Sequence, residues 1–119
     1  MDYSRLAASA LFLTSGSLHF LRPEMFRQIV PPALPNAAEL VAVSGAAEIA
    51  GALGLWVPPL RRPAVIGLVT LLVAVFPANV YMALSHQRYA AVIPAWLLFA
   101  RLPLQAVLIA WVWGLRGPR

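Results

Sequence analysis

Long apolar stretches interrupted by single polar residues recur four times along the chain. They cover approximately residues 4–21, 37–57, 64–84 and 94–115. Each is about as long as an α-helix needs to cross the hydrocarbon core of a bilayer, roughly 20 residues at about 1.5 Å per residue. None shows the regular polar face of a surface helix in a soluble protein. The pattern predicts an all-α fold, a single transmembrane domain in which four helices form an antiparallel up-down bundle, because the connections are short.

Proline and polar residues separate these four stretches. The first connection also carries apolar side chains, so we expect it to lie against the headgroup region or to cap the bundle. Its residues of this kind are Phe26, Ile29, Val30, Pro31, Pro32, Leu34 and Pro35. Asn36 followed by Glu39 predicts a capping box at the start of the second helix. Residues 58–63 are expected to form a tight charged turn, and residues 85–89 a polar connector.

Two of the predicted helices have features that affect packing. In the second, Ala46, Ala50 and Gly54 recur every four positions, a small-residue spacing that lets helices approach closely in lipid. In the third, Pro77 removes the backbone hydrogen bond to the carbonyl of Val73, which predicts a bend. The Asn79 amide is a candidate partner for the carbonyl that this proline leaves free.

Composition supports the membrane interpretation and excludes several kinds of site. The 119 residues are 61% hydrophobic and 11% charged, whereas soluble domains carry about a quarter charged residues. Cysteine is absent, which excludes disulfides, thiol nucleophiles, dithiol relays, iron–sulfur clusters and cysteine-ligated zinc. With only two histidines, we expect no metal site.

The nine basic residues, all arginine, give a net charge of +5, and they lie mostly at the ends of the apolar stretches. That placement is typical of topology signals and interfacial anchors, and it argues against a nucleic-acid partner. The start of the chain, the second connection and the end of the chain hold the larger share. These residues are Arg5, Arg61, Arg62, Arg116 and Arg119. The bias predicts a multi-pass protein of the inner (plasma) membrane with both termini in the cytoplasm.

Each predicted helix carries polar residues in the half of the membrane away from the cytoplasm. They are the candidate ligand-binding residues, and no catalytic residue can be assigned. The set is His19, Ser44, Glu48, Asn79, Arg101 and Gln105. An ionised side chain at the membrane centre costs on the order of 3 kcal/mol, so intramembrane carboxylates are usually paired, neutral or functional.

The expected partner of Glu48 is Arg101, with His19, Asn79 and Gln105 completing the hydrogen bonds that a buried ion pair requires. Two alternatives remain open. Arg101 instead extends to the membrane surface, which leaves Glu48 protonated. In the other alternative, the whole network only fixes the register of the helices. The functional interpretation is a site that binds a small amphipathic ligand or passes a proton.

The same residues give the chain a resemblance to the DoxX-like family of small bacterial integral membrane proteins. The resemblance covers nearly the whole chain. It is carried by His19-Phe20, Pro23, Phe26, Ile29-Val30-Pro31-Pro32, Leu34-Pro35, Ser44-Gly45, Glu48, Arg61-Arg62, Val75-Phe76-Pro77-Ala78-Asn79, Tyr81-Met82 and Arg101-Leu102-Pro103-Leu104-Gln105. It implies a four-helix transmembrane bundle and links to membrane redox systems such as thiosulfate:quinone oxidoreductase.

The resemblance and the polar residues together lead to three functional expectations. The first is a quinone-like ligand bound by an accessory subunit of a membrane redox system, with no intrinsic cofactor and a soluble redox partner. The second is a component that binds or transports lipid or another amphipathic molecule. The third is a structural assembly factor. A standalone enzyme is not expected because no nucleophile–base pair, metal cluster or phosphate loop is visible. A homodimer packed through helices fits all three.

Overall fold

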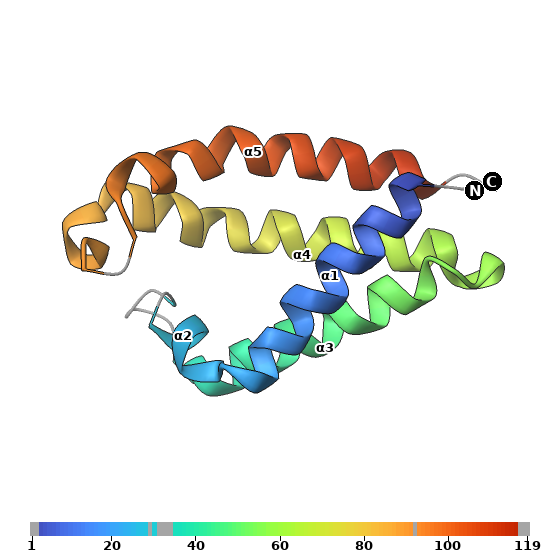
Figure 1. Cartoon of the computed structure of the whole chain (residues 1–119), viewed down its shortest axis with the longest axis horizontal. Coiled ribbons are helices and arrows are strands. Elements are labelled where there is room, and N and C mark those ends of the chain that lie inside the picture. The colour runs from blue at the N-terminus through green and yellow to red at the C-terminus, as the bar shows by residue number, and fades with distance from the viewer. Residues whose placement is uncertain (1–2, 29, 31–34, 92, 117–119) are drawn as a thin grey trace.

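Four long helices make up most of the computed structural model, which describes residues 3–28, 30, 35–91 and 93–116 (Figure 1). Shorter helical segments join or follow them. In chain order the elements are α1 (Tyr3–Leu21), α2 (Pro23–Arg27), α3 (Ala37–Gly54), α4 (Pro58–Leu84), η1 (His86–Tyr89), α5 (Ala95–Trp113) and η2 (Gly114–Arg116). The described residues contain no strand. The predicted all-α, four-helix architecture is confirmed.

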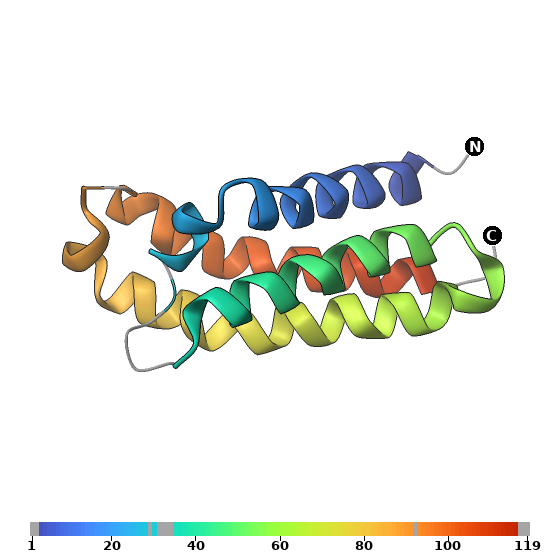
Figure 2. The same cartoon turned by 90° about the horizontal axis from the view of Figure 1, so that it is seen from below.

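The long helices form two antiparallel hairpins that are joined by the turn between α3 and α4. The α1/α3 hairpin includes the short α2, and the α4/α5 hairpin includes η1; α3 packs on α4 between them. The start of α1, the α3–α4 turn and η2 lie at one end of the molecule (Figures 1 and 2). At the other end, α2 lies apart from the second hairpin (Figure 1).

Three helical segments are long and apolar enough to cross a membrane: Ala37–Gly54, Pro58–Leu84 and Ala95–Arg116. Between 17% and 28% of the residues in each most apolar stretch are buried, so most of these residues are at least partly exposed. Exposing so much apolar surface is unfavourable in water and favourable in lipid. Among the described helices α1 has a comparable length but is not in this group, since Arg5, His19 and several hydroxyl residues lower its hydropathy.

Two local predictions differ from the structure. Residues 58–63 are not a separate turn, because α4 already begins at Pro58, and prolines fit the first helical turn, where a backbone N–H has no partner. Asn36 occupies the N-cap position of α3, but in a left-handed conformation (φ 57°) without a side-chain hydrogen bond, so the capping box with Glu39 does not form. Asparagine tolerates that conformation better than most residues.

Four residues of the first connection lie outside the described residues: Ile29, Pro31, Pro32 and Leu34. Arg119 also lies outside them. The described part of the connection contains α2, whose Phe26 contacts α1 by stacking on His19.

We call the end near the α3–α4 turn the closed end, because a single hydrophobic core there includes residues of all four long helices. Its fully or almost fully buried members are Ala8, Phe12, Ala52, Leu55, Val65, Leu68, Val112 and Leu115. We call the opposite end the open end. There α4, η1 and α5 form a separate core of Met82, Ala83, Tyr89 and Leu98, to which the first hairpin contributes no fully buried residue.

Two glycines set the distance between α1 and α3. A Cβ atom added at Gly16 would lie 2.8 Å from the carbonyl oxygen of Gly45, and one added at Gly45 would lie 2.6 Å from Cβ of His19. Real Cβ atoms do not approach so closely. The small residues therefore bring the two helices together at the level of the polar residues.

Candidate functional site

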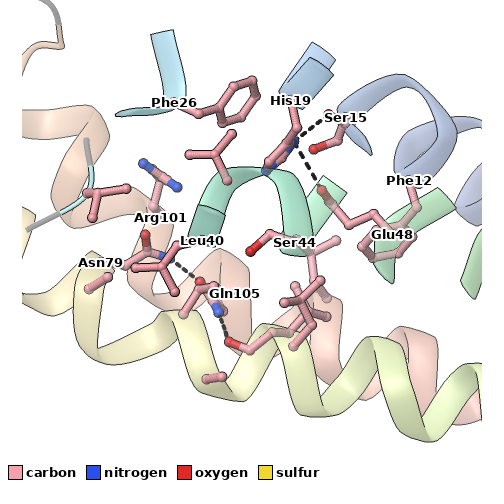
Figure 3. A pocket seen from close by; sticks show the side chains of 18 of the residues that line it. Phe12, Ser15, His19, Phe26, Leu40, Ser44, Glu48, Asn79, Arg101 and Gln105 are labelled. Carbon is pink, nitrogen blue, oxygen red and sulfur yellow. Dashed lines mark hydrogen bonds and ion pairs between the residues drawn. The ribbon is translucent and has the colours of Figure 1, made fainter. Parts of the chain in front are cut away.

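A cavity of about 570 Å³ lies between the two hairpins towards the open end. It is lined by residues of all five α-helices, most of them apolar. All six polar residues singled out from the sequence line it: His19, Ser44, Glu48, Asn79, Arg101 and Gln105 (Figure 3). The structure therefore brings the whole predicted set to one cavity.

His19 and Glu48 form a pair across the α1–α3 contact. Nδ1 of His19 lies 2.6 Å from the backbone carbonyl oxygen of Ser15 and 3.2 Å from Oε2 of Glu48 (Figure 3). A carbonyl oxygen only accepts hydrogen bonds, so Nδ1 carries a proton and donates to Ser15. Oε2 of Glu48 is buried and receives no hydrogen bond of good geometry from a described residue. This oxygen is enclosed by the surrounding protein atoms, so a molecule in the cavity does not reach it.

Phe26 of α2 covers the imidazole ring of His19. The two ring centroids are 3.8 Å apart, and their planes are inclined by 22°. This stacking, together with the bond to Ser15 one turn earlier in α1, fixes the orientation of the imidazole. Sequence reasoning did not single out Ser15 as a site residue, and it assigned Phe26 only to the connection. The four-residue spacing of Ser15 and His19 was the available signal.

Asn79 and Gln105 form a separate network between α4 and α5. The Asn79 side-chain amide donates to Oε1 of Gln105, whose own amide donates to the backbone carbonyl of Leu72 (Figure 3). Both side chains are buried. The predicted bond from Asn79 to the Val73 carbonyl is not formed. Instead, Asn79 binds Gln105, and Gln105 binds the carbonyl of Leu72, one residue before Val73. These two amides already bind each other.

Arg101 of α5 is half-buried, lines the cavity, and makes no ion pair or hydrogen bond with any residue that the structure describes. The predicted Glu48–Arg101 pair was wrong: within the described part of the chain, the ion-pair partner of Glu48 is His19. The physical reason is helix order. Because α5 packs mainly on α4 and α3 packs on α1 and α4, a side chain from α5 reaches Glu48 only across the cavity.

Ser44 lies one turn before Glu48 on α3 and also lines the cavity, where it is half-buried. Metal chemistry finds no support in the described residues, which contain no group of three or more histidine, cysteine, aspartate or glutamate side chains able to hold an ion. The arrangement is instead suited to binding, with one donor-only cation, one carboxylate, a hydroxyl and a histidine set in an apolar wall.

A family model described as a domain of unknown function, DUF8561, matches residues 8–116. The chain belongs to the DUF8561 family. The matched range includes every residue that lines the cavity, so the cavity lies within the DUF8561 domain. No curated protein and no solved structure was found to match the chain.

Proposed function

We propose that this protein binds a small amphipathic molecule in the cavity between its two hairpins. The observation that carries the proposal is the contrast between the cavity's two kinds of lining. Its wall is largely apolar, yet the Arg101 guanidinium lies there with N–H donors that no described protein group accepts. A volume of about 570 Å³ also falls within the range of about 300–1,000 Å³ typical of ligand sites.

The ligand class that we favour is quinone-like. Its polar head offers oxygen acceptors to the Arg101 guanidinium, and its apolar tail suits the leucine- and valine-rich wall. The resemblance to the DoxX-like family supports an accessory role in a membrane redox system. In that role a soluble redox partner supplies the electron carrier, and the chain itself contributes the binding site in the membrane.

The second candidate function is binding or transport of a lipid-like molecule. It is favoured by apolar side chains that line the cavity and are also exposed on the outside of the protein, such as Leu40 and Leu104. A purely structural role, the third candidate, is favoured by the Asn79–Gln105 network alone, since that network is complete without a ligand.

The proposed setting is the bacterial inner membrane, with both termini in the cytoplasm. The arginines support it: Arg5, Arg61, Arg62 and Arg116 all belong to elements at the closed end, where the positive-inside rule places the cytoplasmic side. The cavity then lies in the half of the membrane away from the cytoplasm.

The test is identification of what the purified protein carries. The full chain is extracted in mild detergent and analysed by native mass spectrometry, alongside an Arg101→Gln variant and an Arg62→Gln control in which the exposed arginine of α4 is changed. We expect a retained amphipathic ligand in the unaltered chain and the control, and its loss from Arg101→Gln. Equal occupancy in all three proteins would show that Arg101 does not hold the ligand. An empty cavity that also takes up no added quinone or lipid would contradict the proposed function.

A further inference from the structure

Arg101 presents unused hydrogen-bond donors to the cavity. Its guanidinium has five N–H donors and no acceptor, and no described residue accepts from any of them. The side chain lines the cavity and is only half-buried. Its nitrogen atoms, in contrast to Oε2 of Glu48, are not among the enclosed polar atoms of the described residues. A molecule in the cavity therefore reaches the guanidinium.

The place of Arg101 along α5 makes its charge unfavourable when the cavity is empty. Arg101 lies six residues after Ala95, the first residue of α5, which puts it about 9 Å along a helix long and apolar enough to cross a membrane. In the proposed membrane setting, a cation at that depth is costly unless an anion neutralises it. No described carboxyl group forms an ion pair with Arg101. The missing counter-charge is therefore one that a ligand can supply.

The acidic side chain of the cavity does not stand in the way of an anion at Arg101. Glu48 is the only acid among the residues that line the cavity, and it belongs to the other hairpin. Its enclosed Oε2 lies 3.2 Å from Nδ1 of His19, and Figure 3 shows the carboxyl group well apart from the Arg101 side chain. A head group at Arg101 is thus separated from Glu48.

We propose that the cavity selects amphiphiles whose head group is an anion over neutral molecules of the same shape. A hydrogen bond from a guanidinium to an anion is about twice as strong as one between neutral groups. The planar fork of arginine also fits two oxygens carried on adjacent positions, as in a carboxylate or in a quinone ring with an ionised hydroxyl beside a carbonyl. The apolar wall, which includes Leu72, Val75 and Leu108, accommodates the rest of the molecule.

This inference rests on the proposed binding function and adds the charge of the head group to it. The matched probes are an alkylated hydroxynaphthoquinone, with its hydroxyl beside a ring carbonyl, and the corresponding aminonaphthoquinone. Above the pKa of the ring hydroxyl the first is an anion, whereas the second is neutral and has nearly the same shape. The full chain in nanodiscs of a zwitterionic lipid is equilibrated with each probe by dialysis. Partition into protein-free nanodiscs is subtracted.

We expect the anionic probe to bind about tenfold tighter or more, the difference between a hydrogen bond to a charged group and one to a neutral group. Arg101→Gln keeps an amide donor but removes the charge, so the ratio of the two affinities should fall to about threefold or less. Arg101→Lys keeps the charge and should keep most of the preference.

Arg62→Gln is the matched control, because it removes one positive charge from an exposed position on α4 that does not line the cavity. It should leave the ratio unchanged. The control separates contact with Arg101 from the general attraction of an anion to a chain with a net charge of +5.

A second set of nanodiscs distinguishes two sources of the anion. The shared chemistry is an anionic group on an apolar body, which either a membrane phospholipid or a separate amphiphile supplies. Displacement of the anionic probe by an anionic phospholipid in the nanodisc supports the preference and assigns the site to a phospholipid headgroup. Undiminished binding in those nanodiscs supports it and assigns the site to a separate amphiphile.

The outcomes also separate the preference from the binding function. Equal affinity of the unaltered chain for both probes, or tighter binding of the neutral one, overturns the preference while the binding function stands. An equal fall of the ratio in Arg62→Gln and Arg101→Gln overturns the assignment to Arg101. Absence of binding by either probe, with no ligand retained on purification, overturns both proposals. The ratio of the unaltered chain needs no variant, so an Arg101→Gln protein that fails to fold does not protect the inference.

Discussion

The closed and open ends of the molecule use their polar residues in different ways. At the closed end, the polar side chains lock helices together. Trp56 donates to Oγ of Ser9, Ser9 donates to the backbone carbonyl of Ala52, and Nε of Arg61 donates to the backbone carbonyl of Leu55. The guanidinium of Arg5 lies 5.5 Å from the centre of the Trp56 ring. At this end α1 is fixed to the last part of α3 and to the α3–α4 turn, and the turn is fixed to α4.

At the open end, the Arg101 guanidinium lines the cavity without a described hydrogen-bond partner. The Asn79–Gln105 network joins α4 to α5, and the His19–Glu48 pair joins α1 to α3, but no described polar bond joins the two hairpins across the cavity. The comparison teaches that described polar bonds join α1, α3 and the turn at the closed end, whereas the open end leaves Arg101 without a described partner, as the proposed binding site requires.

The largest expected change in stability comes from truncating a core residue at the closed end, and it tests whether that end holds the bundle together. Leu68→Ala removes a side chain that is 1% exposed and packs against Gly51, and we expect it to lower the free energy of unfolding by about 2–5 kcal/mol. Leu104→Ala, at the cavity wall and 55% exposed, should cost less than about 1 kcal/mol. Denaturant unfolding in detergent, followed by circular dichroism, measures both. Equal losses would mean that the open end contributes as much stability as the closed end.

The next effect concerns the glycines that bring α1 onto α3. Gly45→Ala places a methyl group against His19, and we expect a loss of about 1–3 kcal/mol together with displacement of the imidazole from Glu48. Gly67→Ala is the control, since its Cβ meets nothing within 4 Å and alanine favours a helix. Thermal unfolding gives the stability. The imidazole resonances of His19 report its contact with Glu48, and unchanged resonances in Gly45→Ala would show that the close approach is not what places His19.

The sequence allowed the helices and the residues of the cavity to be predicted, but not their pairing. Length and apolarity indicate where helices lie, and one polar residue in an apolar helix stands out by its cost in lipid. The partner of Glu48 depends on which helices are neighbours. Charge alone favoured Arg101, whereas the close α1–α3 contact makes His19 the partner. Ser15 accepts the bond from His19 through its backbone carbonyl, so only the four-residue spacing of the two residues pointed to this contact.

Some boundaries were also beyond sequence reasoning. The two prolines at residues 58 and 59 favour a turn by composition, yet both fit the first turn of α4, so the helix begins six residues before the predicted start at residue 64. Similarly, the short α2 is a five-residue helix within a segment where proline obscures helical periodicity. In both places proline is compatible with a turn and with the start of a helix, and only the surrounding structure decides between them.

A smaller effect is expected from removing hydroxyl groups at the two ends. Ser9→Ala leaves Nε1 of Trp56 without its acceptor, which should lower stability by about 1–2 kcal/mol. Ser44→Ala at the cavity should leave stability within about 0.5 kcal/mol and act only on ligand affinity. Unfolding and ligand binding are measured on both variants. A stability loss in Ser44→Ala equal to that in Ser9→Ala would mean that the cavity hydroxyl is structural too.

The smallest effect on stability is expected from two exposed cysteine substitutions. Labelling them tests whether the two ends of the molecule face opposite sides of a membrane. The chain has no cysteine, so Leu60→Cys at the closed end and Gln87→Cys at the open end each add a unique thiol at an exposed position without removing an arginine. In intact cells, an impermeant maleimide should label Gln87→Cys and should label Leu60→Cys only after the membrane is opened. The reverse pattern would place the cavity in the cytoplasmic half. Labelling of both from one side would show that α4, which runs between them, does not cross the membrane.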